Sequence, residues 1–123
     1  MNSKKILIVE DDRQLQTALK DKLESENFNV STASDGQEGL EAAKKENPDL
    51  ILIDILLPKI NGISMAKEIK KLNLDIKMIF LTNLSDMQHV ADASDVAFSD
   101  YLVKSDWDID DITKKIKEKL DIK

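Results

Sequence analysis

The sequence predicts an α/β fold in which helices cover both faces of a five-stranded parallel sheet. Three observations indicate this fold. Short apolar runs, typical of strands buried on both faces, recur along the 123 residues. A segment with apolar residues at helical spacing follows each run, so that strand and helix alternate as (βα)5. Such alternation produces parallel strands joined by right-handed crossovers.

Length and composition are those of one globular domain, with 41% hydrophobic and 34% charged residues. The absence of cysteine excludes a disulfide framework and a thiolate metal site. No apolar run approaches the roughly 20 residues of a membrane span, and residues 1–5 show no signal-peptide cleavage pattern. We therefore expect a cytoplasmic protein without membrane association. A net charge of −6 and the lack of a basic stripe predict no direct contact with nucleic acid.

The first half of the chain is expected to form two strands and two helices. Residues 6–9 form the first strand, and a helical stripe from Leu15 to Asn27 follows it. Residues 28–33 alternate weakly and include β-branched side chains, which favours an edge strand. A turn at 34–36 leads into a helix over about 37–46, which an Asn-Pro pair stops.

The second half contains the central strand and two further strand–helix pairs. An unbroken apolar run over 50–53 is followed by Asp54, and apolar residues resume over 55–57. The remaining elements are a helix with Met65, Ile69 and Leu72 on one face, a strand at 78–81, a helix over about 86–97, a strand at 101–103, and a last helix with Ile109, Ile112, Ile116 and Leu120 in line.

The acids before the last helix suit a helix N-terminus and need no metal to explain them. Asp108 is expected as the N-cap, with Asp110 and Asp111 in the first turn. Trp107 would then cover Ile112 as a hydrophobic staple, and the alternative role for it is an anchor for a partner.

Polar side chains directly follow four of the apolar runs. They are Glu10, Asp11, Asp12, Asp54, Thr82 and Lys104. Because the carboxyl ends of parallel strands meet at one edge of the sheet, we expect these side chains to converge there. Clustered carboxylates need a cation, and oxygen ligands without cysteine or a converging histidine suit Mg²⁺ or Mn²⁺. A carboxylate beside such a metal can act as a nucleophile toward a phosphoryl group.

Over essentially its whole length the chain resembles the receiver domain of two-component response regulators. The resemblance is carried by residues 6–12, by Asp54 with Pro58 and Gly62, by Thr82, and by residues 101–104. It implies a flavodoxin-like fold and a single receiver domain over residues 1–123. No output domain is expected within this sequence, which is either a stand-alone receiver or one excised from a larger protein.

The resemblance also implies the roles of the acidic residues. Asp54 is the phosphoacceptor. Glu10 and Asp11 hold Mg²⁺, Asp11 directly and Glu10 through water. The backbone carbonyl of Leu56 is the expected third protein ligand.

Thr82 and Tyr101 are the switch pair by the same resemblance, and Lys104 pairs with the phosphate. Two neighbours depart from the family pattern. Asn83 stands where a small residue usually follows the threonine, and Ser105 stands where a proline usually follows the lysine through a cis peptide. A cis bond to serine would cost about 3 kcal/mol, so we expect a trans peptide there.

The function implied is a signalling switch that catalyses only its own phosphorylation and dephosphorylation. A histidine kinase or phosphotransfer protein would donate the phosphoryl group to Asp54 with Mg²⁺. Phosphorylation would then change the surface of the fourth helix, fifth strand and fifth helix, where an unknown output partner binds. We expect a monomer or a weak dimer.

Three alternatives stay open from the residues alone. The first is a receiver-shaped interaction module that is never phosphorylated, which Asn83 and Ser105 favour. The second is a haloacid-dehalogenase-like phosphatase, although Asp54 lies on the third strand and is followed by Leu56 where that fold has a second acid. The third is a flavodoxin, which lacks support because acids replace its phosphate-binding loop.

The phosphorylated state is predicted to be long-lived. By the resemblance, the side chains two residues after the acceptor and two after the switch threonine flank the approach of the hydrolytic water. Here they are Leu56 and Leu84, and neither can orient a water. Replacing them by Leu56→Asn and Leu84→Glu should speed decay by about tenfold or more. Mass spectrometry after removal of the donor measures this rate, and a fast wild type with an equally fast double variant contradicts the prediction.

Overall fold

The computed structural model describes residues 3–55, 57, 59–72, 76–82, 100–103 and 108–122. The strands are β1 (Lys5–Val9), β2 (Asn29–Ala33), β3 (Leu50–Asp54), β4 (Lys77–Thr82) and β5 (Asp100–Val103). The helices are α1 (Arg13–Ser25), α2 (Gly36–Glu46), α3 (Gly62–Lys71) and α5 (Ile109–Lys119). The helix expected over about 86–97 lies outside the described residues.

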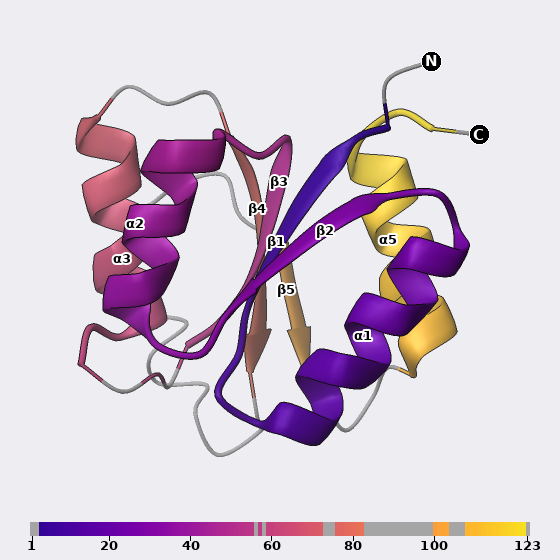
Figure 1. Cartoon of the computed structure of the whole chain (residues 1–123), viewed down its shortest axis with the longest axis horizontal. Coiled ribbons are helices and arrows are strands. Elements are labelled where there is room, and N and C mark those ends of the chain that lie inside the picture. Colours follow the sequence, from indigo (N-terminus) through magenta and orange to yellow (C-terminus); the bar gives the residue numbers. More distant parts are fainter. Residues whose placement is uncertain are drawn as a thin grey trace.

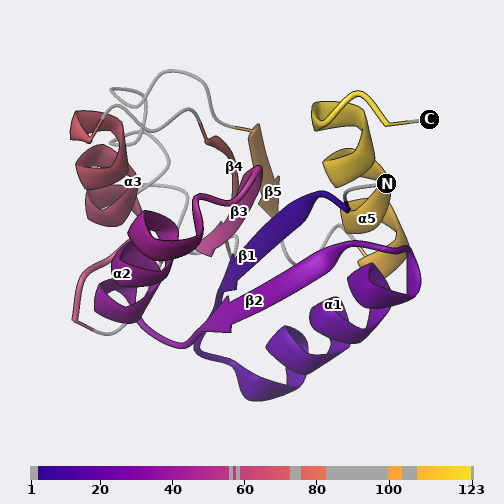
Figure 2. The same ribbon diagram turned by 45° about the horizontal axis from the view of Figure 1, so that its top comes forward.

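All strand pairs are parallel, and the strands follow the order β2-β1-β3-β4-β5. The parallel α/β architecture predicted from the sequence is therefore confirmed. In both views α2 and α3 cover one face of the sheet while α1 and α5 cover the other (Figures 1 and 2). Within the described residues, no helix has both the length and the hydrophobicity to cross a membrane.

The strand β3 lies in the middle of the sheet, as its apolar run predicts. All five of its residues are buried, and β1 and β4 flank it. The strand β2, which was expected at an edge from its weak alternation, is indeed an outer strand.

Two apolar clusters form the core, one on each face of the sheet. The cluster under α2 and α3 includes Val9, Ala43, Ile53, Met65, Ile69 and Phe80. The cluster under α1 and α5 includes Ile8, Leu19, Leu23, Leu52, Ile112 and Ile116. Because successive residues of a strand point to opposite faces, neighbouring residues such as Leu52 and Ile53 feed different clusters.

Each of the described helices begins with a capping aspartate or asparagine. These residues are Asp12, Asp35, Asn61 and Asp108. Each side chain accepts a hydrogen bond from a backbone N–H of the first turn, which stabilises the helix by about 1 kcal/mol. The N-cap prediction for Asp108 is confirmed, and Asp111 completes a capping box with it. Trp107, the expected staple, lies outside the described residues.

The prediction for the buried face of α3 is wrong at one position. Met65 and Ile69 are fully buried, but Leu72 is 44% exposed. The helix ends at Lys71, and Leu72 is its C-cap. The buried stripe of α3 therefore ends before this residue.

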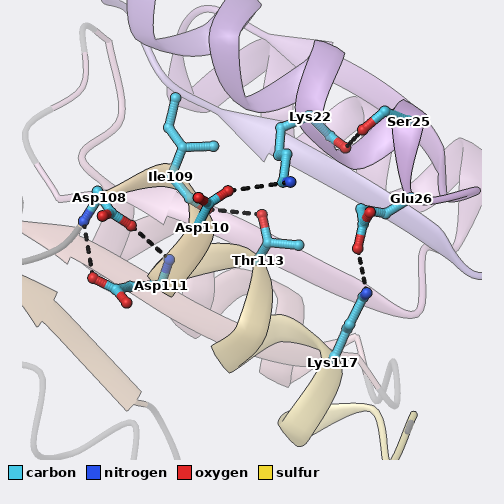
Figure 3. Close-up of polar contacts among 9 residues, drawn as sticks. All are labelled: Lys22, Ser25, Glu26, Asp108, Ile109, Asp110, Asp111, Thr113 and Lys117. Carbon is cyan, nitrogen blue, oxygen red and sulfur yellow. Dashed lines mark hydrogen bonds and ion pairs between the residues drawn. The ribbon is translucent and has the colours of Figure 1, made fainter.

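Two ion pairs join α1 and its C-cap to α5 across the seam between the two helices (Figure 3). The Nζ atom of Lys22 lies 3.1 Å from Asp110 Oδ1, and this hydrogen bond raises the pKa of Lys22. One turn further along the seam, Lys117 donates a hydrogen bond to Glu26. Both side chains of that second pair are about one third exposed, at 31% and 30%.

The Glu26–Lys117 pair should make part of the stability depend on pH. The hydrogen bond from Lys117 holds the pKa of Glu26 below its usual range. A carboxyl group with a lowered pKa stabilises the fold above its unfolded pKa, about 4.3 for glutamate. That contribution is lost as the pH falls through the folded-state pKa. We therefore expect Glu26→Gln to lower the melting temperature slightly at pH 7 and to have less effect toward pH 3.

Thermal unfolding followed by circular dichroism between pH 7 and pH 3 tests this prediction. Glu24→Gln is the matched control, since Glu24 pairs with Lys20 inside α1 and does not cross the seam. A melting-temperature difference for Glu26→Gln that grows as the pH falls would contradict the assignment.

Candidate functional site

Three carboxylates gather at the carboxyl ends of β1 and β3. Glu10 and Asp11 directly follow β1, and Asp54 is the last residue of β3. Each offers an oxygen, and these oxygens all lie within 4.8 Å of one another. Glu10 and Asp54 are buried, with 1% and 6% of their surface exposed, while Asp11 is exposed. The expected convergence of strand-end acids therefore holds for Glu10, Asp11 and Asp54, which together form the acidic group.

Glu10 is held in place through its backbone and its side chain. Its N–H donates to the Ala33 carbonyl at 3.0 Å, which ties the end of β1 to the end of β2. Its Oε2 accepts a hydrogen bond from the backbone N–H of Asp12 at 3.1 Å. The Gln16 amide of α1 donates to the carbonyl oxygens of Glu10 and Ala33 at 2.9 and 3.1 Å. Gln16 was not identified from the sequence, because only the fold brings it to these carbonyl groups.

Asp12 has a different task from the two acids before it. Its Oδ1 accepts hydrogen bonds from Gln14 N at 3.0 Å and Leu15 N at 3.3 Å, as the N-cap of α1. It is not among the three carboxylates that approach one another. The run of three acids thus divides into two site residues and one helix cap.

Gly62 lets the chain return closely to Asp54 after the loop that follows β3. Its N–H donates to the Ile55 carbonyl at 2.8 Å. A Cβ atom at this position would lie 2.3 Å from the Asp54 carbonyl oxygen and 2.7 Å from Ile53 Cγ2. Any larger residue would push α3 away from the acidic end of β3, so the glycine is required by this close approach.

The donor set fits a hard divalent cation. The three groups are carboxylates, which supply the anionic oxygen ligands that Mg²⁺ and Mn²⁺ prefer. Two of them are buried, and burial of like charges side by side is costly unless a cation offsets their repulsion. Glu10, Asp11 and Asp54 would therefore hold such an ion.

Among the other predicted site residues, the sheet register places the backbone of Thr82 at the same edge. In the sheet register Asp54 pairs with Leu81, so Thr82 lies one residue beyond the end of β3. Thr82 in turn pairs with Val103, the residue before Lys104. The side chains of Thr82 and Tyr101, and the whole of Lys104, Leu56, Asn83 and Ser105, lie outside the described residues.

Comparison with known proteins gives consistent matches. The sequence model of the response regulator receiver domain matches residues 6–117. The chain is 36% identical over 102 residues to the alkaline phosphatase synthesis transcriptional regulatory protein PhoP of Bacillus subtilis, covering 83% of this chain and 42% of PhoP. It is 38% identical over 116 residues to the response regulator ArlR of Staphylococcus saprophyticus, covering 94% of this chain and 52% of ArlR. The chain thus spans about half the length of these relatives.

A solved structure shares the fold over nearly the whole chain. It is a CheY-like response regulator receiver domain protein from Methanospirillum hungatei, with a TM-score of 0.90 and 32% identity. The match covers 98% of this chain and 95% of that protein.

Mg²⁺ affinity should depend on Asp11 and not on its neighbour Asp12. We expect Asp11→Ala to weaken Mg²⁺ binding by about tenfold or more, because one of three anionic ligands is lost. Asp12→Asn is the matched control, since asparagine caps a helix as well as aspartate does and Asp12 lies outside the acidic group. Calorimetric titration measures both affinities, and unchanged affinity in Asp11→Ala would show that the metal assignment is wrong.

Proposed function

Because the chain belongs to the family of response regulator receiver domains, we propose that it is a phosphoacceptor switch in which Asp54 takes the phosphoryl group. One observation carries the assignment to Asp54. It is the acid that ends the buried central strand, and it meets Glu10 and Asp11 within 4.8 Å. A carboxylate that is buried beside other carboxylates is a candidate for a chemical role.

The reaction is a transfer between two covalent bonds. A carboxylate oxygen of Asp54 attacks phosphorus, and the bond between phosphorus and the donor breaks. From a phosphohistidine donor the imidazole nitrogen takes the electron pair of the broken bond, and an acyl phosphate remains on Asp54. Mg²⁺ or Mn²⁺, when bound, neutralises the negative charge that the carboxylates and the phosphoryl oxygens bring together.

The chain's own residues would bind the metal ion and the phosphoryl oxygens. Glu10 and Asp11 hold the ion together with Asp54, and the Leu56 carbonyl is the additional ligand implied by the family. Lys104 would hold the phosphoryl oxygens as a cation.

The switch would act through β4 and β5, the strands that follow β3 in the sheet. Thr82 would bind the phosphoryl group and Tyr101 would follow it inward, which changes the surface formed by the fourth helix, β5 and α5. The register supports this pairing, since Tyr101 lies opposite Phe80 on β4, two residues before Thr82.

The partners are a histidine kinase or phosphotransfer protein as donor and an output partner at the changed surface. PhoP is a transcriptional regulatory protein by name, and the part of it that this chain matches is less than half of its length. For the receiver itself we propose protein partners, a cytoplasmic location and no direct nucleic-acid contact.

The alternative is a receiver-shaped module that is not phosphorylated. Its support, Asn83 and Ser105, lies outside the described residues, whereas the acidic group favours the phosphoacceptor. Membership of the receiver family leaves no support for the phosphatase or flavodoxin alternatives.

Phosphorylation by a small donor tests the proposed function. Incubation with acetyl phosphate or phosphoramidate and Mg²⁺ should add one phosphoryl group, detected by intact mass, and hydroxylamine should remove it. Asp54→Asn should abolish this labelling while keeping the fold, because the substitution is nearly isosteric. Asp12→Asn should still be labelled. Full labelling of Asp54→Asn would place the nucleophile elsewhere, and no labelling of the wild type would favour the interaction module.

A further inference from the structure

Lys59, in the loop between β3 and α3, has a left-handed backbone conformation with φ of 69°. The other non-glycine residues with positive φ in the described part of the chain are Asn27, Asn47 and Asp121. Asparagine and aspartate tolerate this region, whereas a long side chain such as lysine does so at a cost in conformational free energy. A residue that stays there near a functional site is compensated by its surroundings.

The compensation visible at Lys59 is an ion pair with Asp35. The Nζ atom of Lys59 lies 3.5 Å from Asp35 Oδ2. The other oxygen, Oδ1, accepts a hydrogen bond from Glu38 N at 2.8 Å, because Asp35 is the N-cap of α2. The Asp35 side chain is only 17% exposed, against 67% for Lys59. The flexible Lys59 ammonium group therefore pairs with a carboxylate that its hydrogen bond to α2 already fixes.

A backbone contact seats the same part of the loop on α2. A Cβ atom on Gly36, the first residue of α2, would lie 1.9 Å from the carbonyl oxygen of Ile60. The Ile60 side chain packs against the core cluster under α2 and α3. The loop tip is thus fixed on the start of α2 by Lys59 and Ile60 together.

This loop begins directly after Asp54, a member of the acidic group. The loop leaves from Asp54 and returns at Gly62, whose N–H donates to the Ile55 carbonyl at 2.8 Å. The loop that directly follows Asp54 is thus tied at its base by Gly62 and at its tip by Lys59.

We propose that Lys59 is a positioning residue for the metal site. Its ion pair with Asp35 offsets the cost of its own left-handed backbone and so fixes the loop that follows Asp54, which keeps Asp54 in place beside Glu10 and Asp11 for binding a divalent cation. This inference rests on the proposed function, because it concerns the same Mg²⁺ site.

The sign of the effect separates positioning from simple electrostatics. Lys59 is a cation at the same edge of the sheet as three carboxylates, so its charge alone opposes Mg²⁺ binding. Removing it would then tighten binding. If Lys59 acts by positioning the loop, removing its side chain weakens binding instead.

The test is calorimetric titration of the full chain with MgCl₂ in the absence of any phosphodonor. Lys59→Ala and Asp35→Asn should each weaken binding about threefold, within the range of a partly exposed ion pair. The double variant should be no weaker than either single variant, since both remove the same interaction. Lys59→Gly should recover the wild-type affinity, because glycine adopts the left-handed backbone without steric cost.

Two features of the design keep other effects apart. Asparagine at position 35 preserves the helix cap while it removes the charge. Glu24→Gln is the matched control, because it removes one negative charge from an exposed ion pair on α1 and should leave Mg²⁺ affinity unchanged.

Unchanged or tighter binding in Lys59→Ala overturns the inference, and so does equally weak binding in Lys59→Gly and Lys59→Ala. In those cases the wild type still binds Mg²⁺, and the proposed function stands. A wild type that binds no Mg²⁺ overturns the metal site of the proposed function and this inference with it.

Discussion

The burial of both faces of the parallel sheet confines polar chemistry to the ends of the strands. Helices cover each face, and the two apolar clusters leave no room for an uncompensated charge inside. Among the described residues, Glu10 and Asp54 are the charged side chains that are nevertheless buried. Burying an isolated carboxylate costs several kcal/mol unless it is compensated. Both buried acids lie at the carboxyl end of a strand, where a cation can reach them beside exposed Asp11.

The same edge of the sheet also receives the beginnings of the described helices. In a strand–helix alternation the helix that follows a strand starts at that strand's carboxyl end. The caps Asp12, Asp35, Asn61 and Asp108 therefore belong to the site edge as much as the reactive acids do. Aspartate serves here both as a helix cap and as a member of the acidic group. The contacts of each side chain distinguish the two roles. Asp12 turns to its helix, whereas Asp11 turns to the acidic group.

The loop after Asp54 couples the site to a neighbouring helix. Gly62 brings the loop back against the Asp54 carbonyl, and Gly36 lets Ile60 touch the start of α2. Neither position tolerates a Cβ atom without movement of the backbone. The positions of Lys59 and Ile60 thus depend on α2 and its cap, although α2 carries no member of the acidic group.

The order of strands and helices, the buried central strand, and the acids at its end follow from local patterns in the sequence. Apolar runs of 50–53 and 6–9 leave no alternative to burial on both faces, and the acids that end them must meet at one edge of a parallel sheet. Asp108 as a helix cap is equally local, because capping involves residues within one turn.

Contacts between distant parts of the chain decided the rest. No local pattern places the Gln16 amide on the Ala33 carbonyl or pairs Lys59 with Asp35. Leu72 keeps the helical spacing of Met65 and Ile69 but is exposed, because α3 ends at Lys71 and Leu72 is only its C-cap. Sequence periodicity reports which face of an element is apolar. The direction of a polar side chain at an element's end depends on partners that only the folded chain brings within hydrogen-bonding distance.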